Sequence, residues 1–286
     1  MDKSSLTALI AEAGLKRLSP GLEAQARPTV FVATESSSQK KPALGASRIG
    51  GDPDLPAGLP WPLREGRPLS FLAQFRLEDL SGFEPQGLLP ARGQLYFFYD
   101  AVECPWGFDP KHRGGWKVFH SAAPTLVPSA APKSLAESGR FGPCTVRFEA
   151  GSTLPSVHSG YVHSLGLSDD EVDAYVELEQ KVGGPVAPGD GCHRFFGHPD
   201  QVQGDMEDEC QFVSNGIYCG GSDYYDDPRA AALQPGAKDW RLLLQIDSDD
   251  RAGMMWGDLG MLYFWIREQD LRSGSFEEVW TVLQCC

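Results

Sequence analysis

The sequence has no long hydrophobic run, and it is poor in basic residues. No segment approaches the roughly 18 consecutive apolar residues that a membrane-spanning helix needs. The 286 residues include 25 Lys and Arg against 39 Asp and Glu, which gives a formal net charge of -14. Nucleic-acid phosphates and anionic membranes are bound by clustered basic side chains, so neither is an expected partner. The acidity suits a basic protein partner or a cation, although solubility alone also explains it.

Cysteine pairs with a recognisable spacing are also missing. The seven cysteines are an odd number, and no Cys-x-x-Cys occurs. Free thiols in a reducing cytoplasm are therefore expected, and the N-terminal stretch lacks the basic and apolar regions of a signal peptide. For Cys285 and Cys286 we expect a frayed tail with ordinary thiols, with a vicinal disulfide or metal clip as the alternative.

Sequence motifs of catalysis and cofactor binding are absent as well. There is no Gly-x-Ser-x-Gly elbow, no Gly-x-Gly-x-x-Gly and no P-loop, so no cofactor is expected. Cys192 precedes His193, but neighbours in an extended strand point to opposite faces. These absences favour a protein that is not an enzyme.

What the sequence does contain is an internal repeat. The run 71–75 (Phe-Leu-Ala-Gln-Phe) precedes 93–99 (Gly-Gln-Leu-Tyr-Phe-Phe-Tyr). The run 242–246 (Leu-Leu-Leu-Gln-Ile) precedes 260–266 (Gly-Met-Leu-Tyr-Phe-Trp-Ile) in the same way. Such self-similarity predicts one supersecondary unit used twice, and two copies are too few for a solenoid.

The repeat also indicates the fold class. Its strands are apolar at successive positions, which is typical of strands that are covered on both faces. We predict an α+β fold with mainly antiparallel sheets and few helices. One domain spans residues 1–286, and in it two pseudo-repeated strand units, at about 68–100 and 240–267, pack together.

The remaining elements are read from periodicity and capping residues. An amphipathic helix is predicted at 4–18, and a capping box formed by Ser168 and Glu171 begins the clearest helix. A further helix is predicted at 205–212 with Asp205 as its N-cap, and a polar loop at 224–239. Further strands are predicted at 28–34, 116–120, 144–149 and 276–284.

The segment 48–62 holds four prolines and three glycines, which exclude a helix or a central strand. Its apolar residues predict an ordered loop that folds onto the core, with Trp61 as an anchor.

Several of these short motifs occur together in a family of bacterial proteins. They are Arg48-Ile-Gly-Gly-x-Pro-x-Leu-Pro with Trp61-Pro62, Phe71-Leu-Ala-Gln74, Gly93-x-Leu95-x-Phe97-x-Tyr99, Leu243-Leu-Gln245-x-Asp247 with Gly257-Asp258-x-Gly260, and Gln284-Cys285. In this order they resemble the YwqG-like family, over roughly residue 43 to the C-terminus. The resemblance implies a single-domain, cytoplasmic α+β protein with no established activity. Some members look like neighbours of toxin–immunity systems, and the family supplies no catalytic residues.

Acidic and histidine residues are the candidate metal ligands. Asp247 and Asp258 could form a loose divalent site, although Arg251 and Ala252 occupy positions where an EF-hand needs an oxygen ligand and a glycine. The alternative is a solvated hairpin loop. Weaker candidates for zinc or iron are His193 and His198 with Asp200 and the nearby Asp205, and the alternative there is a turn to which His198 is hydrogen-bonded.

Two glutamines occupy the same place in both repeats. Gln74 and Gln245 lie inside apolar strands, and a buried amide without a partner costs about 1–3 kcal/mol. We favour the interpretation that each ties its strand to a loop such as 48–62. The alternative is that both line a polar cleft near the pseudo-twofold axis.

Trp106 and Trp256 lie in glycine-flanked loops, and exposed tryptophans are typical binding anchors. The leading hypothesis is therefore a non-enzymatic interaction module, of the immunity or antitoxin kind, that holds a basic protein partner by charge complementarity. The alternative is an enzyme or a small-ligand or metal-binding protein with a cleft between the two repeats, using Asp247, Asp258 and His198.

Overall fold

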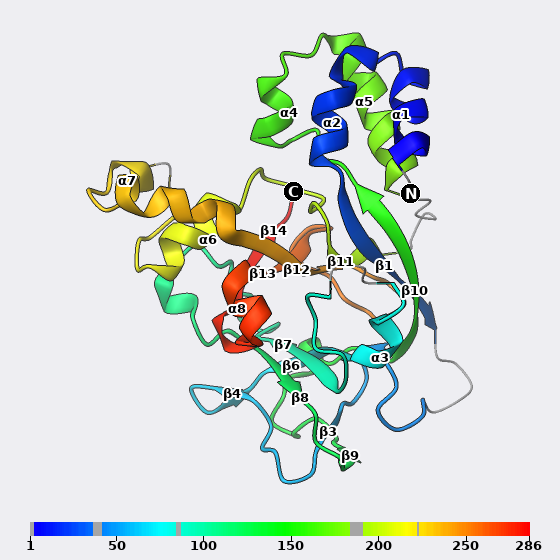
Figure 1. Cartoon of the computed structure of the whole chain (residues 1–286). Coiled ribbons are helices and arrows are strands. Elements are labelled where there is room, and N and C mark those ends of the chain that lie inside the picture. Colours follow the sequence, from blue (N-terminus) through cyan, green and yellow to red (C-terminus); the bar gives the residue numbers. More distant parts are fainter. Residues whose placement is uncertain (1–2, 37–41, 84–86, 184–190, 222) are drawn as a thin grey trace.

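The computed structural model, which describes residues 3–36, 42–83, 87–183, 191–221 and 223–286, is built around a ten-stranded antiparallel sheet (Figure 1). Its strand order is β14-β13-β12-β11-β1-β10-β2-β6-β7-β8. These strands are β1 (Arg27–Ser36), β2 (Arg48–Ile49), β6 (Ser70–Arg76), β7 (Gln94–Tyr99), β8 (Trp116–Ser121), β10 (Cys144–Thr153), β11 (His193–Phe196), β12 (Trp240–Asp247), β13 (Met261–Arg267) and β14 (Trp280–Gln284). The predicted α+β class with mainly antiparallel sheets is confirmed.

The order of the strands is mirrored about the centre of the sheet. The long strands β1 and β10 pair at the centre, and each is flanked by a short strand, β11 or β2. Beyond these lie β12-β13-β14 on one side and β6-β7-β8 on the other. The register shifts between Phe71 and Ala73 in β6, and between Leu242 and Leu244 in β12. The two predicted repeat units thus take corresponding places in the sheet, while the superposition of one on the other stays a prediction.

The two outer groups of strands pack against each other through aromatic side chains. The ring centroids of Phe97 in β7 and Phe264 in β13 are 5.1 Å apart. Those of Trp116 in β8 and Trp280 in β14 are 5.0 Å apart, and the Trp116 indole donates a hydrogen bond to the Val279 carbonyl. This contact forms the main hydrophobic core, to which β7 contributes Leu95, Phe97 and Tyr99.

A second, smaller core covers the opposite face of β6 and β7. It contains Phe71 and Phe98, and Trp61 packs edge-on against Phe98 at 5.4 Å. The Trp61 indole donates to the Leu69 carbonyl. The segment 48–62 therefore folds onto the core with Trp61 as an anchor, as predicted. The exclusion of a central strand is wrong, because Arg48 and Ile49 form β2, which pairs with both β10 and β6 before the first proline. The strand β3 (Asp54–Pro56) covers this face with Leu55 and pairs with β9 (Leu126–Pro128). A separate pair is formed by β4 (Leu63–Arg64) and β5 (Arg67–Pro68).

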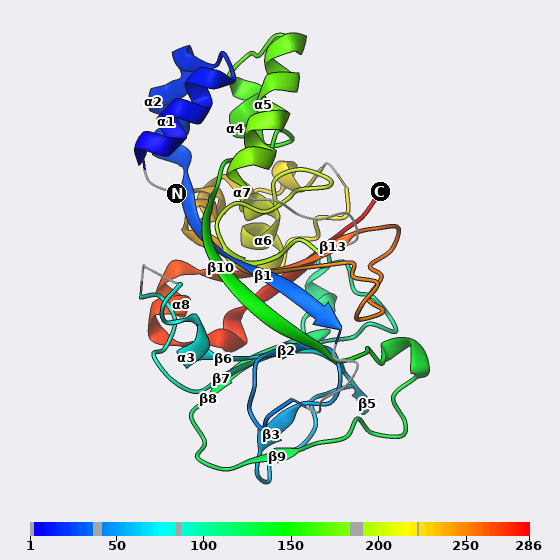
Figure 2. The same cartoon turned by 90° about the vertical axis from the view of Figure 1, so that its right-hand side faces the viewer.

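Four helices gather at one end of the β1–β10 ribbon, as Figures 1 and 2 both show. They are α1 (Lys3–Glu12), α2 (Ser19–Gln25), α4 (Gly160–Ser164) and α5 (Asp169–Val182), and they share a core of their own. The predicted capping box of Ser168 and Glu171 begins α5. Arg17 extends the side-chain contacts of this group with two hydrogen bonds to the Glu171 carboxylate. The remaining helices are α3 (Leu77–Leu80), α6 (Glu207–Ser214), α7 (Ala230–Leu233) and α8 (Glu268–Ser273).

Four local predictions differ from the structure. The helix predicted at 4–18 breaks at Gly14, whose φ of 76° is left-handed, and a 3-10 turn separates α1 from α2. Helix α6 begins at 207, because Asp205 accepts a hydrogen bond from the Gly160 N–H instead of capping it. The region 224–239 is mostly helical, because Tyr224 and Tyr225 pack on Phe212. The last strand starts only at 280, after a 3-10 turn.

None of the helices in the described parts of the chain is both long and apolar enough to span a bilayer.

Candidate functional site

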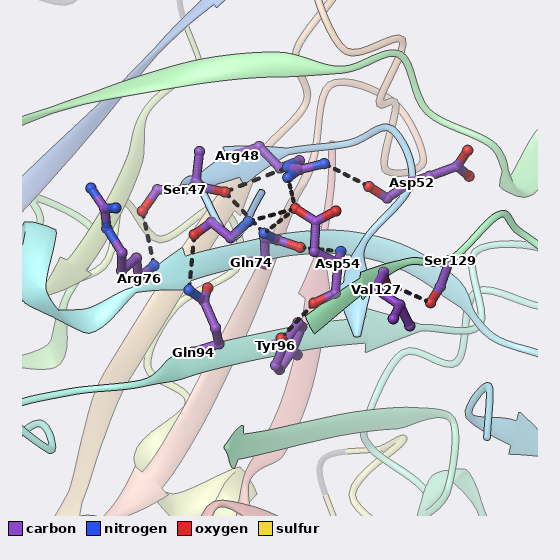
Figure 3. Close-up of polar contacts among 12 residues, drawn as sticks. Ser47, Arg48, Asp52, Asp54, Gln74, Arg76, Gln94, Tyr96, Val127 and Ser129 are labelled. Atoms are coloured by element: carbon purple, nitrogen blue, oxygen red, sulfur yellow. Dashed lines mark hydrogen bonds and ion pairs between the residues drawn. The ribbon is translucent and has the colours of Figure 1, made fainter. Parts of the chain in front are cut away.

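The first buried polar network lies at the junction between β2 and the loop that follows it (Figure 3). The Gln74 side chain in β6 accepts a hydrogen bond from the Asp54 N–H at 2.7 Å and donates one to the Ala46 carbonyl at 2.9 Å. Arg48 forms an ion pair with the Asp54 carboxylate, and the Tyr96 hydroxyl donates to the Asp54 carbonyl. We call this set, Ala46, Arg48, Asp54, Gln74 and Tyr96, the sealed network.

A second network lies at the junction between β11 and the loop that follows it, and its main contacts match those of the sealed network. The Gln245 side chain in β12 accepts from the Asp200 N–H at 2.9 Å and donates to the Cys192 carbonyl at 2.7 Å. Arg194 forms an ion pair with the Asp200 carboxylate, and the Tyr263 hydroxyl donates to the Asp200 carbonyl. We call this set, Cys192, Arg194, Asp200, Gln245 and Tyr263, the open network.

The same backbone path produces both networks. The segments are 48–54 (Arg-Ile-Gly-Gly-Asp-Pro-Asp) and 194–200 (Arg-Phe-Phe-Gly-His-Pro-Asp). Each begins with the Arg and ends with the Asp of its network, and its third and fourth residues have left-handed backbone. A side chain at Gly50 would clash, since a Cβ there would lie 2.1 Å from the Gly142 carbonyl oxygen. Phe196 takes the matching place at φ 59°. The shared pattern Arg-x-x-Gly-x-Pro-Asp is a sequence signal that the search for repeats missed.

Both glutamines are wholly buried, and each binds backbone groups on both sides of the neighbouring short strand, β2 or β11. The favoured interpretation of Gln74 is therefore confirmed, since it ties β6 to the segment 48–62. Gln245 ties β12 to the segment 192–200 in the same way.

The two networks differ in how far solvent reaches them. The side chains of Arg48 and Asp54 are 7% and 4% exposed. Arg194 is equally buried, at 6%, but the Asp200 side chain is 32% exposed. In addition, the Arg48 Nε donates to the Ala46 carbonyl, whereas the buried Arg194 Nε has no hydrogen-bond acceptor among the described residues. The open network is thus both more accessible and less completely satisfied.

The open network forms one wall of a cleft of ≈ 630 Å³, which we call the α5 cleft. Cys192, Arg194 and Asp200 contribute from the open network, and Val176 and Glu179 contribute from α5. The loop after β10 closes the cleft between them, with Ser156, Val157 and His158. A volume of this size accommodates a small organic ligand.

Ionisable groups in the α5 cleft are perturbed by burial. Burial raises the pKa of Glu179 to about 7, and the nearby Asp200 carboxylate acts in the same direction, although the Val157 N–H donates to Glu179 and partly offsets them. Burial and Asp200 also raise the pKa of Cys192 to about 12. A thiol with so high a pKa is a poor nucleophile at neutral pH, so Cys192 is not suited to covalent catalysis.

The histidines proposed as metal ligands are committed to other contacts. The His193 Nδ1 accepts from the Asp247 N–H, and its Nε2 contacts the buried Asp249 carboxylate at 3.1 Å. His198 contacts the Gln25 carbonyl at 2.7 Å rather than its own turn, and burial lowers its pKa to about 3. Among the residues that the structure describes, no three His, Cys, Asp or Glu side chains are grouped to hold a metal ion.

The acidic pair does not come together at one site. The Asp247 carboxylate accepts from the Cys192 N–H at 2.9 Å, and burial raises its pKa. Asp258 is exposed in the loop before β13, where its carbonyl accepts from the Cys286 N–H. Asp247 therefore supports the backbone of the open network, and the structure gives the pair no common role.

The exposed anchor predicted at Trp256 is wrong. The Trp256 side chain is buried against Tyr99 and Phe141, and its indole donates to the Asp247 carbonyl. Trp106 is partly buried and packs against the main core. Glycines flank these tryptophans because the backbone packs closely there, as at Gly107, where a Cβ would lie 2.3 Å from the Thr281 carbonyl oxygen.

The C-terminal cysteines also differ from the expectation of a frayed tail. Cys285 is buried in the main core, while Cys286 is exposed. All seven cysteines are free.

The comparisons with known proteins place the chain among uncharacterised domains. The family model of a domain of unknown function (DUF1963) matches residues 47–285. No curated protein matches the chain. The match includes the open network, the α5 cleft and all of the sealed network except Ala46, so a function must be argued from their geometry.

Proposed function

The chain belongs to the DUF1963 family, and we propose that it binds a small polar ligand in the α5 cleft. The observation that carries this proposal is the contrast between the two networks. The same set of contacts is closed to solvent at Asp54 but opens at Asp200 into a cleft of ≈ 630 Å³. In the open network the buried Arg194 Nε also lacks an acceptor among the described residues, and buried polar groups of folded proteins are normally paired.

The character of the walls supports a binding role. Val157 and Val176 offer apolar surface, while Glu179, Asp200 and Gln201 offer hydrogen-bonding groups. Ligand sites in proteins usually combine apolar walls with a few polar groups that fix the orientation of the ligand. The cleft lies between α5 and the open network, whereas the space between the repeat units holds the aromatic core.

Binding of a basic protein partner remains a second proposal that rests on the net charge of -14. Trp256 cannot serve as an exposed anchor for such a partner, because its side chain is buried. The finer relationship to YwqG-like proteins and the cytoplasmic location likewise stay predictions from the sequence.

A thermal-shift screen of the full chain against polar metabolites would test ligand binding. Compounds that stabilise the protein would then be titrated against two variants of adjacent α5 residues. Val176→Trp fills the cleft, whereas Glu177→Trp places the same ring at an exposed position. We expect Val176→Trp to weaken binding at least tenfold and Glu177→Trp to leave it unchanged. Equal affinities in both variants, or a screen without any stabilising compound, would overturn the proposal.

A further inference from the structure

The charges that solvent can reach in the α5 cleft are mainly negative. Asp200 is 32% exposed, and Glu179 lies on the facing helix. The guanidinium of Arg194 is only 6% exposed and is already paired with Asp200 behind the wall. An anionic ligand would therefore meet the carboxylates before it could reach the guanidinium.

The composition of the walls also bears on the class of ligand. Among the described residues that line the α5 cleft, the only ring is that of His158, which is exposed. Sites that bind flat aromatic compounds commonly offer large aromatic side chains for stacking. The chemistry instead matches a ligand with a positively charged end that pairs with the carboxylates, and with a short aliphatic part that contacts Val157 and Val176.

Resting on the proposed function, we infer that the ligand of the α5 cleft carries an ammonium or guanidinium group, which is held between Glu179 and Asp200. A cation beside both carboxylates would offset part of the cost of burying their charges. Arg194 acts as a positioning residue, because its ion pair fixes Asp200 at the wall.

This inference predicts that binding releases a proton. Glu179 has a pKa of about 7 in the empty protein, and a cation beside it favours the ionised form. The charged and titratable groups that face Glu179 are Asp200 from the loop after β11, Arg194 in β11 itself, Cys192 just before that strand and His158 from the loop after β10. Below the pKa the binding-competent form is scarce, so affinity should fall about tenfold between pH 8 and pH 6.

Three compounds with the same five-carbon chain test the charge preference directly. They are n-pentylamine, 1-pentanol and pentanoate, titrated into the isotope-labelled full chain at pH 8. The N–H of Val157, which donates to Glu179, and the Nε–H of Arg194 serve as NMR reporters. We expect the amine to bind at least tenfold more tightly than the alcohol, and pentanoate to bind no better than the alcohol.

Two variants separate the contribution of Glu179 from that of the nearby His158 side chain. Glu179→Gln should weaken amine binding and abolish its dependence on pH between 6 and 8. His158→Gln should keep that dependence, because His158 does not supply the charge in this scheme. Calorimetry of the amine in buffers of different ionisation enthalpy would report the released proton.

The inference is overturned if pentanoate binds as tightly as the amine, if the amine moves neither reporter, or if Glu179→Gln keeps the pH dependence. Those outcomes do not decide the proposed function. Compounds from the metabolite screen that Val176→Trp excludes would still establish the cleft as a binding site, for a ligand of another class.

Discussion

The sealed and open networks share an Arg–Asp ion pair and matching hydrogen bonds of a Gln and a Tyr, yet they face different surroundings. Asp54 is covered by neighbouring loop backbone, including the Gly45 N–H that donates to its carboxylate. Asp200 makes the same ion pair with arginine but borders the α5 cleft. The network itself is therefore a structural device that joins a strand to a loop. Function is to be sought in what differs, which is the access to Asp200 and the helix that faces it.

The largest expected difference between the networks lies at the aspartates. Asp54→Ala should lower the free energy of unfolding by about 3–5 kcal/mol, because it leaves the buried Arg48 without a counter-charge. Asp200→Ala also removes the counter-charge of a buried arginine, but it should cost only about 1–2 kcal/mol, because Arg194 and Asp200 border the α5 cleft, from which water can take the place of the carboxylate. Urea denaturation would measure both, with exposed Asp250→Ala as the control. Equal losses at Asp54 and Asp200 would remove the contrast on which the binding proposal rests.

The glutamines should behave alike in both networks. Each side chain is wholly buried and satisfies one backbone N–H and one backbone carbonyl. Gln74→Leu and Gln245→Leu should each cost about 2–3 kcal/mol, because those backbone groups would be left unpaired. If the free energies of unfolding of the two variants differed by more than about 1 kcal/mol, the two glutamines would not have equivalent roles.

Glu179 belongs only to the open side, and its charge should destabilise the empty protein. Its pKa is raised from 4.5 to about 7, so the folded chain holds a proton that the unfolded chain has already lost between these values. Stability therefore falls as the pH rises through this window. Glu179→Gln should raise the free energy of unfolding by about 1–2 kcal/mol at pH 8 and change it little at pH 4.

Thermal unfolding at the two pH values would measure this effect. Glu177→Gln on the same helix provides the matched control, because that side chain is exposed. If Glu179→Gln gave no gain in stability at pH 8, the pKa of Glu179 would lie near the ordinary value of a glutamate.

The smallest effects are expected at the tyrosines. Tyr96→Phe and Tyr263→Phe each remove one hydrogen bond to the carbonyl of the network aspartate. Each should cost about 1 kcal/mol. Because solvent approaches the open network, Tyr263→Phe should cost no more than Tyr96→Phe, and calorimetric melting of both variants would check this order.

The sequence indicated those parts of the fold that depend on local pattern. The two apolar runs around Gln74 and Gln245 are strands, and the capping box at Ser168 begins a helix, because both signals lie within a few residues of the structure they describe. The residues 224–239 were misjudged as a polar loop. Their helical turns depend on the packing of Tyr224 and Tyr225 on Phe212, which local composition does not reveal.

Only part of the candidate site could be predicted from the sequence. Asp200 is predicted only as a weak metal ligand, and Gln245 is predicted to tie its strand to a loop, with a polar cleft near the pseudo-twofold axis as the alternative. Arg194 was missed, although its pattern with Asp200 repeats that of Arg48 with Asp54. Glu179 could not be found from sequence, because it is one of several acidic residues on α5 and only the tertiary fold brings it opposite Asp200.

The central position of β1 has a practical consequence for anyone who shortens this chain. The family match begins at residue 47, after β1 has ended, yet β1 pairs with both β10 and β11 in the middle of the sheet. A chain trimmed to the matched boundaries would lose the strand that joins its two halves. The freed edges of β10 and β11 would then offer unpaired backbone groups to other molecules, which promotes aggregation. The family boundary is thus narrower than the folding unit.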